Sequence, residues 1–405
     1  MSESKLQVST SRSLPPPAST VALWYHAWPG SVQSCATSAA RRLRRSAVLV
    51  LACSAVAASL GPPAWAASGL LLQTTPVGLH PIAVAADGQT GLAIVAASDT
   101  TSVLATVTGR LVRRIPGGVG YDPYGASPHA VAVDVIRARA FVANFNRGTV
   151  SVIDTRTGAL VRTIRVGGGP DALAVDEGSG HVFVANYGAG TVSMLDGARG
   201  RLIRTVPVGQ VPVAVAVDAP RGHVYVASFA DSSVAVLNAR TGAAQGVIPV
   251  GHRPNDVVVD ARTGHAFVAN WDDGTVSVID TTRQTVLRTV PVGLTPVVAA
   301  IDSLAGEVLV ANFTGNSVSM LDTHSGRVLR TIAVGHYPSA LAVDPRTGEA
   351  FVANAGSNSV SIIDTHTRRL TGTVPVGQYP NAIAAAGGRV LVTNEQDNTL
   401  TFFQG

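Results

Sequence analysis

Residues 338–379 read PSALAVDPRTGEAFVANAGSNSVSIIDTHTRRLTGTVPVGQY, and this repeating unit decides the fold. Four short apolar runs lie within it, separated by turns rich in Asp, Asn, Thr and Gly: Ala340–Val343, Ala350–Ala353, Ser359–Ile363 and Leu370–Val376. Its opening proline recurs every 42 residues, at Pro128, Pro170, Pro212, Pro254, Pro296, Pro338 and Pro380. The sequence is therefore a tandem array of one motif with four predicted strands.

A period of 42 residues with four strands per unit is typical of the blades of a β-propeller. Turns such as Asp260–Gly264 suit a hairpin in which the glycine takes a positive φ. The first run of each unit is apolar on both faces, as at Val258 and Val259, which fits a strand packed between two sheets. We therefore predict an all-β fold of four-stranded blades, with the strands of each blade lettered A to D from the axis outward.

The number of blades follows from how the first and last units fit together. Seven complete units begin at a proline, and the unit from Pro380 has only three strands. Residues 68–78 align without gaps on residues 325–335, so the N-terminal strand is predicted to complete the C-terminal blade. This closure gives eight blades in one domain, residues 68–405, and removes two exposed sheet edges. The irregular unit from Pro81, with Val95-Ala96-Ala97, leaves a seven-bladed ring as the alternative.

The second run of most units ends in a common pattern, as in Phe351-Val352-Ala353-Asn354, and the last unit has Leu391-Val392-Thr393-Asn394. Together with Thr275–Asp280 and Pro291–Gly293, this pattern resembles the YVTN family of β-propeller repeats. The resemblance covers residues 68–405 and implies a propeller in an exported or surface-layer protein. More distantly, the repeat resembles lactonase-type propellers, the haem-binding propeller of nitrite reductase and the heavy chain of amine dehydrogenase. None of these likenesses determines an activity.

The segment before the repeats is predicted to direct export. A basic cluster at residues 41–45 precedes an uncharged apolar run at 46–60, and Ala64-Trp65-Ala66 fits a cleavage site. We interpret residues 41–67 as a signal peptide and residues 1–40, rich in Ser, Pro and Ala, as a low-complexity extension. The alternative, an uncleaved anchor, is disfavoured because the run is shorter than the ~20 residues that span a bilayer.

The charge of the chain lies in this leader. The net charge is +5, but residues 1–67 hold six of the 30 basic residues and one of the 25 acidic residues. Residues 68–405 therefore carry 24 of each and are neutral, which argues against a nucleic-acid partner. Both cysteines, Cys35 and Cys53, also precede the repeats, so no disulfide framework is expected there.

Departures from the repeat on the face that carries the D–A and B–C loops are the first candidates for a site. The residue after each repeated proline varies, and the polar residues found there include His129, Asp171, Asn255 and Asn381. Asp256 is a further departure, at a position where the other units have Ala or Val. Such a set could bind a cation or a polar ligand at the funnel mouth. The alternative is that a solvated rim tolerates polar residues without a binding role.

The loops of the same face supply the remaining candidates. The D–A loops carry His252, Arg253, His336, Tyr337 and Tyr379. The B–C loops of five units carry an aromatic residue, and Trp271 is the one tryptophan outside the leader. Trp, Tyr and Arg are enriched at interaction hot spots, so this ring of side chains could bind a partner. The alternative is that the repeated aromatic residue packs on the neighbouring blade.

Two repeated polar residues are interpreted as structural. The Asp that follows the first strand, as at Asp260, is expected to form the turn. The Asn that ends the second strand, as at Asn270, is expected to hydrogen-bond the backbone of the following loop.

No catalytic motif was found in the chain: neither a G-x-S-x-G elbow, an H-E-x-x-H pair, a Walker loop nor a Rossmann fingerprint. No metal site or cofactor is predicted, although a lone haem ligand at His129 or His336 stays open. We predict an exported, monomeric, non-catalytic binding module of the periplasm, cell surface or medium, with a protein or small polar ligand on the funnel face. The alternatives are a propeller enzyme (a lactonase, lyase or cofactor-dependent oxidoreductase) and a surface-structural protein.

Overall fold

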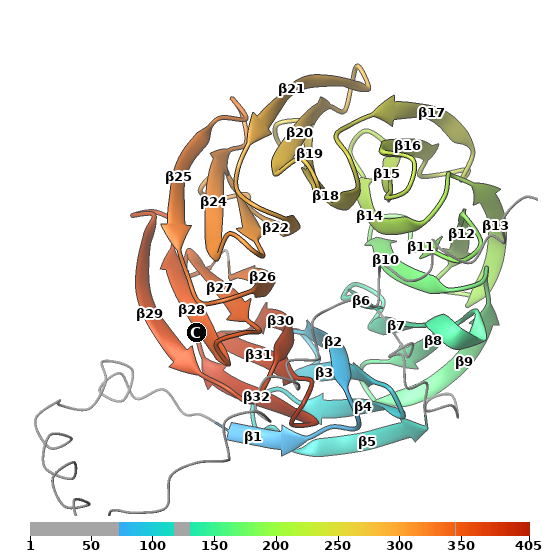
Figure 1. The fold of residues 1–405 in the computed structure, drawn as a ribbon. Coiled ribbons are helices and arrows are strands. Elements are labelled where there is room, and N and C mark those ends of the chain that lie inside the picture. The colour runs from blue at the N-terminus through green and yellow to red at the C-terminus, as the bar shows by residue number, and fades with distance from the viewer. Residues whose placement is uncertain (1–72, 117–129, 345) are drawn as a thin grey trace, which may run out of the picture. The chain divides into compact units, whose positions relative to one another are not determined.

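The computed structural model describes residues 73–116, 130–344 and 346–405. These residues form eight four-stranded antiparallel sheets arranged as blades around a ring (Figure 1). The predicted extension, the signal peptide and His129 lie outside the described residues. Within the described part the only helix is the short 3-10 turn Phe145–Arg147, so no helix there could span a membrane.

Each blade has its strands in the order A to D from the axis outward. The inner A strands are β2 (Pro81–Asp87), β6 (Ala130–Asp134), β10 (Pro170–Asp176), β14 (Pro212–Asp218), β18 (Pro254–Asp260), β22 (Pro296–Asp302), β26 (Pro338–Asp344) and β30 (Pro380–Ala386). The B strands are β3 (Leu92–Ala97), β7 (Arg139–Asn144), β11 (His181–Asn186), β15 (His223–Ser228), β19 (His265–Asn270), β23 (Glu307–Asn312), β27 (Glu349–Asn354) and β31 (Arg389–Asn394).

The two outer positions follow the same order around the ring. The C strands are β4 (Thr100–Ala105), β8 (Thr149–Asp154), β12 (Thr191–Asp196), β16 (Ser233–Asn238), β20 (Thr275–Asp280), β24 (Ser317–Asp322), β28 (Ser359–Asp364) and β32 (Thr399–Gln404). The D strands are β5 (Leu111–Pro116), β9 (Ala159–Arg165), β13 (Arg201–Pro207), β17 (Ala244–Pro249), β21 (Thr285–Pro291), β25 (Val328–Ala333), β29 (Arg369–Pro375) and β1 (Gln73–Pro76). Blades are numbered 1 to 8 from the blade of β2 to the blade of β30.

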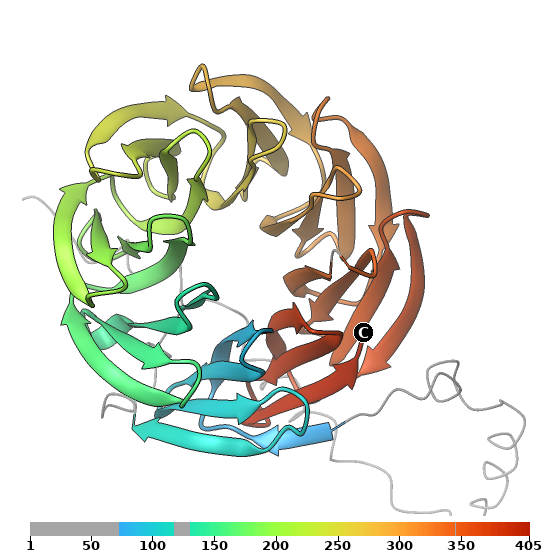
Figure 2. The same cartoon turned by 180° about the vertical axis from the view of Figure 1, so that it is seen from behind.

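The ring closes as the sequence predicts. Strand β1 pairs antiparallel with β32, with Gln73 opposite Phe402 and Pro76 opposite Thr399. The N-terminal strand thus becomes the outer strand of blade 8, and Figure 2 shows the same junction from behind. The irregular unit from Pro81 also forms a complete blade, β2 to β5, so eight blades are confirmed and the seven-bladed alternative is wrong.

The hydrophobic core lies between neighbouring blades. In one cluster Phe267 and Val276 of blade 5 pack against Val308 and Leu321 of blade 6, all of them fully buried. Because every blade has a neighbour on each side, strands B and C bury both faces, as in β19 and β20. The continuously apolar A strands are half-buried and pack against these clusters, as Val258 does.

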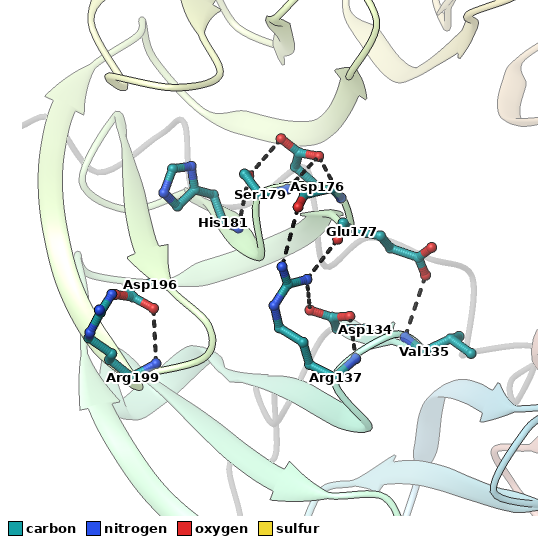
Figure 3. Close-up of polar contacts among 10 residues, drawn as sticks. Asp134, Val135, Arg137, Asp176, Glu177, Ser179, His181, Asp196 and Arg199 are labelled. Carbon is teal, nitrogen blue, oxygen red and sulfur yellow. Dashed lines mark hydrogen bonds and ion pairs between the residues drawn. The ribbon is translucent and has the colours of Figure 1, made fainter.

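The repeated Asp, which ends the A strand in blades 1 to 7, forms the A–B turn, as expected. Asp134 accepts the backbone N–H of Arg137 at 2.9 Å and pairs with the Arg137 guanidinium at 3.1 Å (Figure 3). Arg137 also donates to the Glu177 carbonyl of the next blade at 2.7 Å. The turn chemistry of one blade therefore also joins it to its neighbour.

The repeated Asn at the end of the B strand is also structural, but its partners differ from the expected loop backbone. The buried Asn270 amide donates to the hydroxyls of Thr275 and Ser277 on strand C, each at 2.9 Å. The same two bonds recur at Asn144, Asn186, Asn312, Asn354 and Asn394. The amide thus ties the end of strand B to the beginning of strand C.

Candidate functional site

The D–A connections and B–C loops lie on one face of the ring, which we call the upper face. The residue before each A-strand proline has a left-handed backbone in six blades: His80, Val211, Arg253, Thr295, Tyr337 and Tyr379, with φ between 45° and 58°. In five of them, all except His80, the carbonyl accepts the N–H of the residue after strand B, as from Trp271 to Arg253 at 3.0 Å. A side chain before proline rarely adopts this conformation, so these bonds hold strained positions in place.

Two of the predicted residues of blade 5, Arg253 and Trp271, meet in one cluster. The Arg253 guanidinium lies 5.6 Å from the centre of the Phe229 ring and pairs with Asp272 at 3.3 Å. Trp271 meets the same Phe229 ring edge to face at 6.0 Å. This group, Phe229, Arg253, Trp271 and Asp272, is called the blade-5 cluster below.

His252 lies beside this cluster and is anchored by Asp273. The Asp273 carboxylate accepts the His252 backbone N–H at 2.7 Å, and its other oxygen lies 2.9 Å from His252 Nδ1. These two contacts lower the pKa of Asp273. The imidazole itself stays largely exposed, with 75% of its surface accessible.

Asn255 and Asp256 are neighbours deeper in blade 5, at a β-bulge after Pro254. Asn255 Nδ2 donates to the Val297 carbonyl at 2.7 Å, and Asp256 Oδ2 accepts the Ala299 N–H at 2.8 Å. Both partners belong to β22 of the next blade. Burial raises the pKa of Asp256 to about 6. These side chains therefore bind the inner strand of blade 6.

Tyr337 and His336 lie at the junction of blades 6 and 7. The Tyr337 ring stacks on Phe313, with centroids 4.9 Å apart, and its backbone N–H donates to Asn316 Oδ1 at 2.9 Å. The His336 N–H donates to Ser357 at 2.7 Å. Tyr337 is 41% exposed, so one face of the stacked pair is available at the surface.

Tyr379 and Asn381 belong to a polar group where blade 8 meets blade 1. Asn381 Nδ2 donates to Glu395 Oε2 at 3.0 Å, and His80 Nδ1 lies 3.9 Å from the other carboxylate oxygen. Burial raises the pKa of Glu395, and both neighbours oppose that rise. Burial, followed by the Glu395 charge, raises the pKa of Tyr379 to about 12.

Sequence reasoning did not single out Glu395. It stands directly after Asn394, where blades 2 to 6 have an aromatic residue. This departure from the repeat is the sequence feature that could have identified Glu395 as a candidate.

Asp171 lies in blade 3, at the β-bulge after Pro170. Its charge adds to burial in raising the pKa of Tyr187, whose ring meets Phe145 of blade 2 at 5.8 Å. The Phe145–Tyr187, Phe229–Trp271 and Phe313–Tyr337 pairs each join neighbouring blades. The repeated aromatic residue thus packs across blades, as the structural interpretation expected, and some of these rings are also partly exposed.

The predicted residues do not converge on one site, because their contacts form separate groups in different blades. Across residues 73–116, 130–344 and 346–405, no three His, Cys, Asp or Glu side chains gather as a metal site. Two pockets, of about 520 and 460 Å³, are lined by turn residues of the opposite, lower face, among them Arg262 and His324 in one and Arg346 in the other. Neither pocket includes a predicted site residue.

Comparison with known proteins gives a family and a fold. A family model described as outer membrane protein assembly factor BamB matches residues 146–404, which is more than half of the chain. No curated protein matches the chain.

Two solved structures share the fold at low identity. Hydrazine synthase of Kuenenia stuttgartiensis is 17% identical with a TM-score of 0.59, over 69% of this chain and 96% of that one. The computationally designed Ika8 protein is 17% identical with a TM-score of 0.65, over 82% of this chain and 99% of that one. At this identity the likeness concerns the architecture alone.

Proposed function

Because the chain belongs to the propeller family described as outer membrane protein assembly factor BamB, we propose that it is an exported, non-catalytic binding module. The predicted signal peptide and the resemblance to YVTN repeats support export. The family description favours a protein partner engaged in assembly at the cell envelope. We further propose that the module acts as a monomer, without a bound metal or haem.

The blade-5 cluster is the observation that carries this proposal. Arg253 is held between an aromatic face and a carboxylate on a strained backbone, so its position is set before a partner arrives. Trp and Arg are the residues most enriched at hot spots, and a preorganised side chain loses less entropy on binding. We assign the protein partner to this cluster on the upper face.

The alternative of a funnel-mouth enzyme has less support. Asn255 and Asp256 are two of the five polar residues predicted at the funnel mouth, and both hydrogen-bond the backbone of β22. A carboxylate that holds a neighbouring strand contributes to stability more directly than to chemistry on a ligand.

Site-specific photo-crosslinking in the source cell tests the proposal. A photoreactive residue replaces Asp272 on the upper face or, as control, Thr263 on the lower face. We expect a discrete protein adduct from position 272 alone. The purified partner is then titrated against wild type, Arg253→Ala, Trp271→Ala and the control Arg262→Ala.

Loss of either cluster side chain is expected to weaken binding about tenfold or more. Arg262→Ala, on the lower face, should bind as wild type. Adducts from position 263 alone, or unchanged affinity in both cluster variants, would refute the assignment of the partner to this face.

A further inference from the structure

The outer strands of the blades carry arginine and no carboxylate. The eight D strands contain nine arginines and neither Asp nor Glu. Residues 68–405 as a whole hold 24 basic and 24 acidic residues, so the acidic ones lie elsewhere on the ring. Although the net charge of residues 68–405 is zero, the outer rim of the ring is therefore positively charged.

A β-bulge recurs in the outer strands, at the residue before the main arginine position. In blade 3 the register shifts between Met194 and Leu195, so Ile203 bulges immediately before Arg204. Five blades combine a bulged aliphatic residue with arginine: Val112–Arg113, Val161–Arg162, Ile203–Arg204, Leu287–Arg288 and Leu329–Arg330. The other two bulges place Gln245 before Gly246 and Thr371 before Gly372. At these seven bulges, an aliphatic bulge residue is thus always followed by arginine, and a bulge residue that is not aliphatic is never followed by one.

Three neighbouring blades concentrate this pattern. Strands β5, β9 and β13 follow one another along the outside of the ring (Figure 1) and contact in sequence. They carry six arginines: Arg113, Arg114, Arg162, Arg165, Arg201 and Arg204. They also expose five aliphatic side chains by 38% to 49%: Val112, Leu160, Val161, Leu202 and Ile203. We call this surface the cationic sector.

The arginine stems are held by the next blade. A side chain at Gly200 would lie 2.6 Å from Arg162 Cδ, so the glycine makes room for the stem. Arg162 Nη1 donates to the Gly200 carbonyl at 3.3 Å. A Cβ atom at Gly242 would lie 3.5 Å from Arg204 Cδ, so the Arg204 stem is also in van der Waals reach of the next blade. The stems are therefore positioned, while each planar guanidinium has further N–H donors for an anion.

We propose that the cationic sector docks the protein on an anionic lipid surface. Guanidinium groups bind phosphate in a bidentate manner, and exposed aliphatic side chains enter the boundary between headgroups and acyl chains. A purely ionic polymer would require the arginines but not the aliphatic residues paired with them. The bulges disturb the strand edge, which disfavours addition of a partner strand instead. This surface is the rim of the ring and is separate from the blade-5 cluster.

Co-sedimentation with vesicles tests the proposal, using the protein as purified from cells. Vesicles of phosphatidylglycerol and phosphatidylethanolamine are compared with vesicles of phosphatidylcholine, at about 0.1 M salt, where the Debye length is about 10 Å. We expect binding to the anionic vesicles alone. Arg113→Gln/Arg162→Gln/Arg204→Gln should lower the partition coefficient roughly 100-fold, since each arginine near such a surface contributes about fivefold.

Two further variants separate charge from apolar contact. The triple change Arg240→Gln/Arg262→Gln/Arg346→Gln removes the same charge from turns of blades 4, 5 and 7 and should bind as wild type. Val161→Thr/Ile203→Thr keeps every charge and should weaken vesicle binding several-fold, while leaving binding to soluble polyphosphate unchanged. If the first triple variant melts early, Arg204→Gln alone should still show a loss of about fivefold.

Three results would overturn the proposal. These are equal binding to phosphatidylcholine, an equal loss in the control triple variant, and vesicle binding that is insensitive to Val161→Thr/Ile203→Thr. The last result, combined with tight binding to polyphosphate, would assign the cationic sector to an acidic polymer instead.

Discussion

The backbone of Gly167 lies directly against the carboxamide of Asn186. A Cβ atom at Gly167 would be 2.7 Å from Asn186 Cγ, closer than real Cβ contacts. The same relationship joins Gly251 to Asn270, Gly293 to Asn312, Gly335 to Asn354 and Gly377 to Asn394. In blades 3, 5, 6, 7 and 8, the glycine inside the D–A loop and the Asn that ends strand B therefore form one packing unit.

Gly167→Ala is expected to destabilise the protein, because neither the backbone nor the buried Asn186 amide can move without losing hydrogen bonds. Overpacking of this kind costs about 1–3 kcal/mol. Gly168→Ala is the matched control, since no atom lies within 4 Å of a Cβ there. Chemical denaturation compares the two, and equal free energies of unfolding would contradict the close approach.

Asn270→Ala should lower the free energy of unfolding by roughly 1–3 kcal/mol, because it removes one buried and one partly buried hydrogen bond and leaves Thr275 and Ser277 without the amide donor. A double-mutant cycle with Ser277→Ala measures the coupling directly. We expect the double variant to be less destabilised than the sum of the single variants. Strict additivity would mean that the Asn270–Ser277 bond contributes nothing.

Asp256 should make stability depend on pH. Its pKa is raised to about 6, so the folded protein holds a proton that the unfolded chain releases near pH 4. The unfolded state thus binds fewer protons over this interval, and the Asp256 contribution falls as the pH rises from about 4 to above 6. Wild type should lose roughly 1–3 kcal/mol relative to Asp256→Asn over that range.

Thermal melting at several pH values measures the Asp256 effect. Asp272→Asn, at an exposed carboxylate of the same blade, serves as the control and should follow wild type. A constant difference between wild type and Asp256→Asn at all pH values would contradict the burial of this carboxyl.

Removal of β1 should open the ring. A chain that begins at Val77 lacks the strand that pairs with β32 and therefore exposes the edge at Leu400 to Phe402. Exposed edges promote association between chains, so we expect a lower melting temperature and concentration-dependent oligomers. Light scattering and calorimetry compare this chain with one that begins at Gly69. A monomer with unchanged melting would show that closure by β1 is dispensable.

Most of the architecture was predictable because the information is local and repeated. The 42-residue period, the Asp–Gly turns and the missing outer strand at Pro380 each depend on neighbours in sequence. The alignment of residues 68–78 on 325–335 was sufficient to predict the pairing of β1 with β32. One local inference failed in detail, because the Asn270 amide binds hydroxyls of strand C instead of loop backbone.

The candidate site was less predictable, since its contacts cross from one blade to the next. Asp256 departs visibly from the repeat, but only the structure shows that it holds Ala299 of the following blade. Trp271 and Arg253 were both singled out, whereas their shared partner Phe229 lies on another blade. The sequence by itself determined the repeat, the eight blades and their closure, because strand period and turn chemistry are properties of short segments. Only the tertiary structure decided which side chains meet and where charge gathers. The net charge of the sequence does not show how the folded ring distributes its charged residues between its faces and its rim.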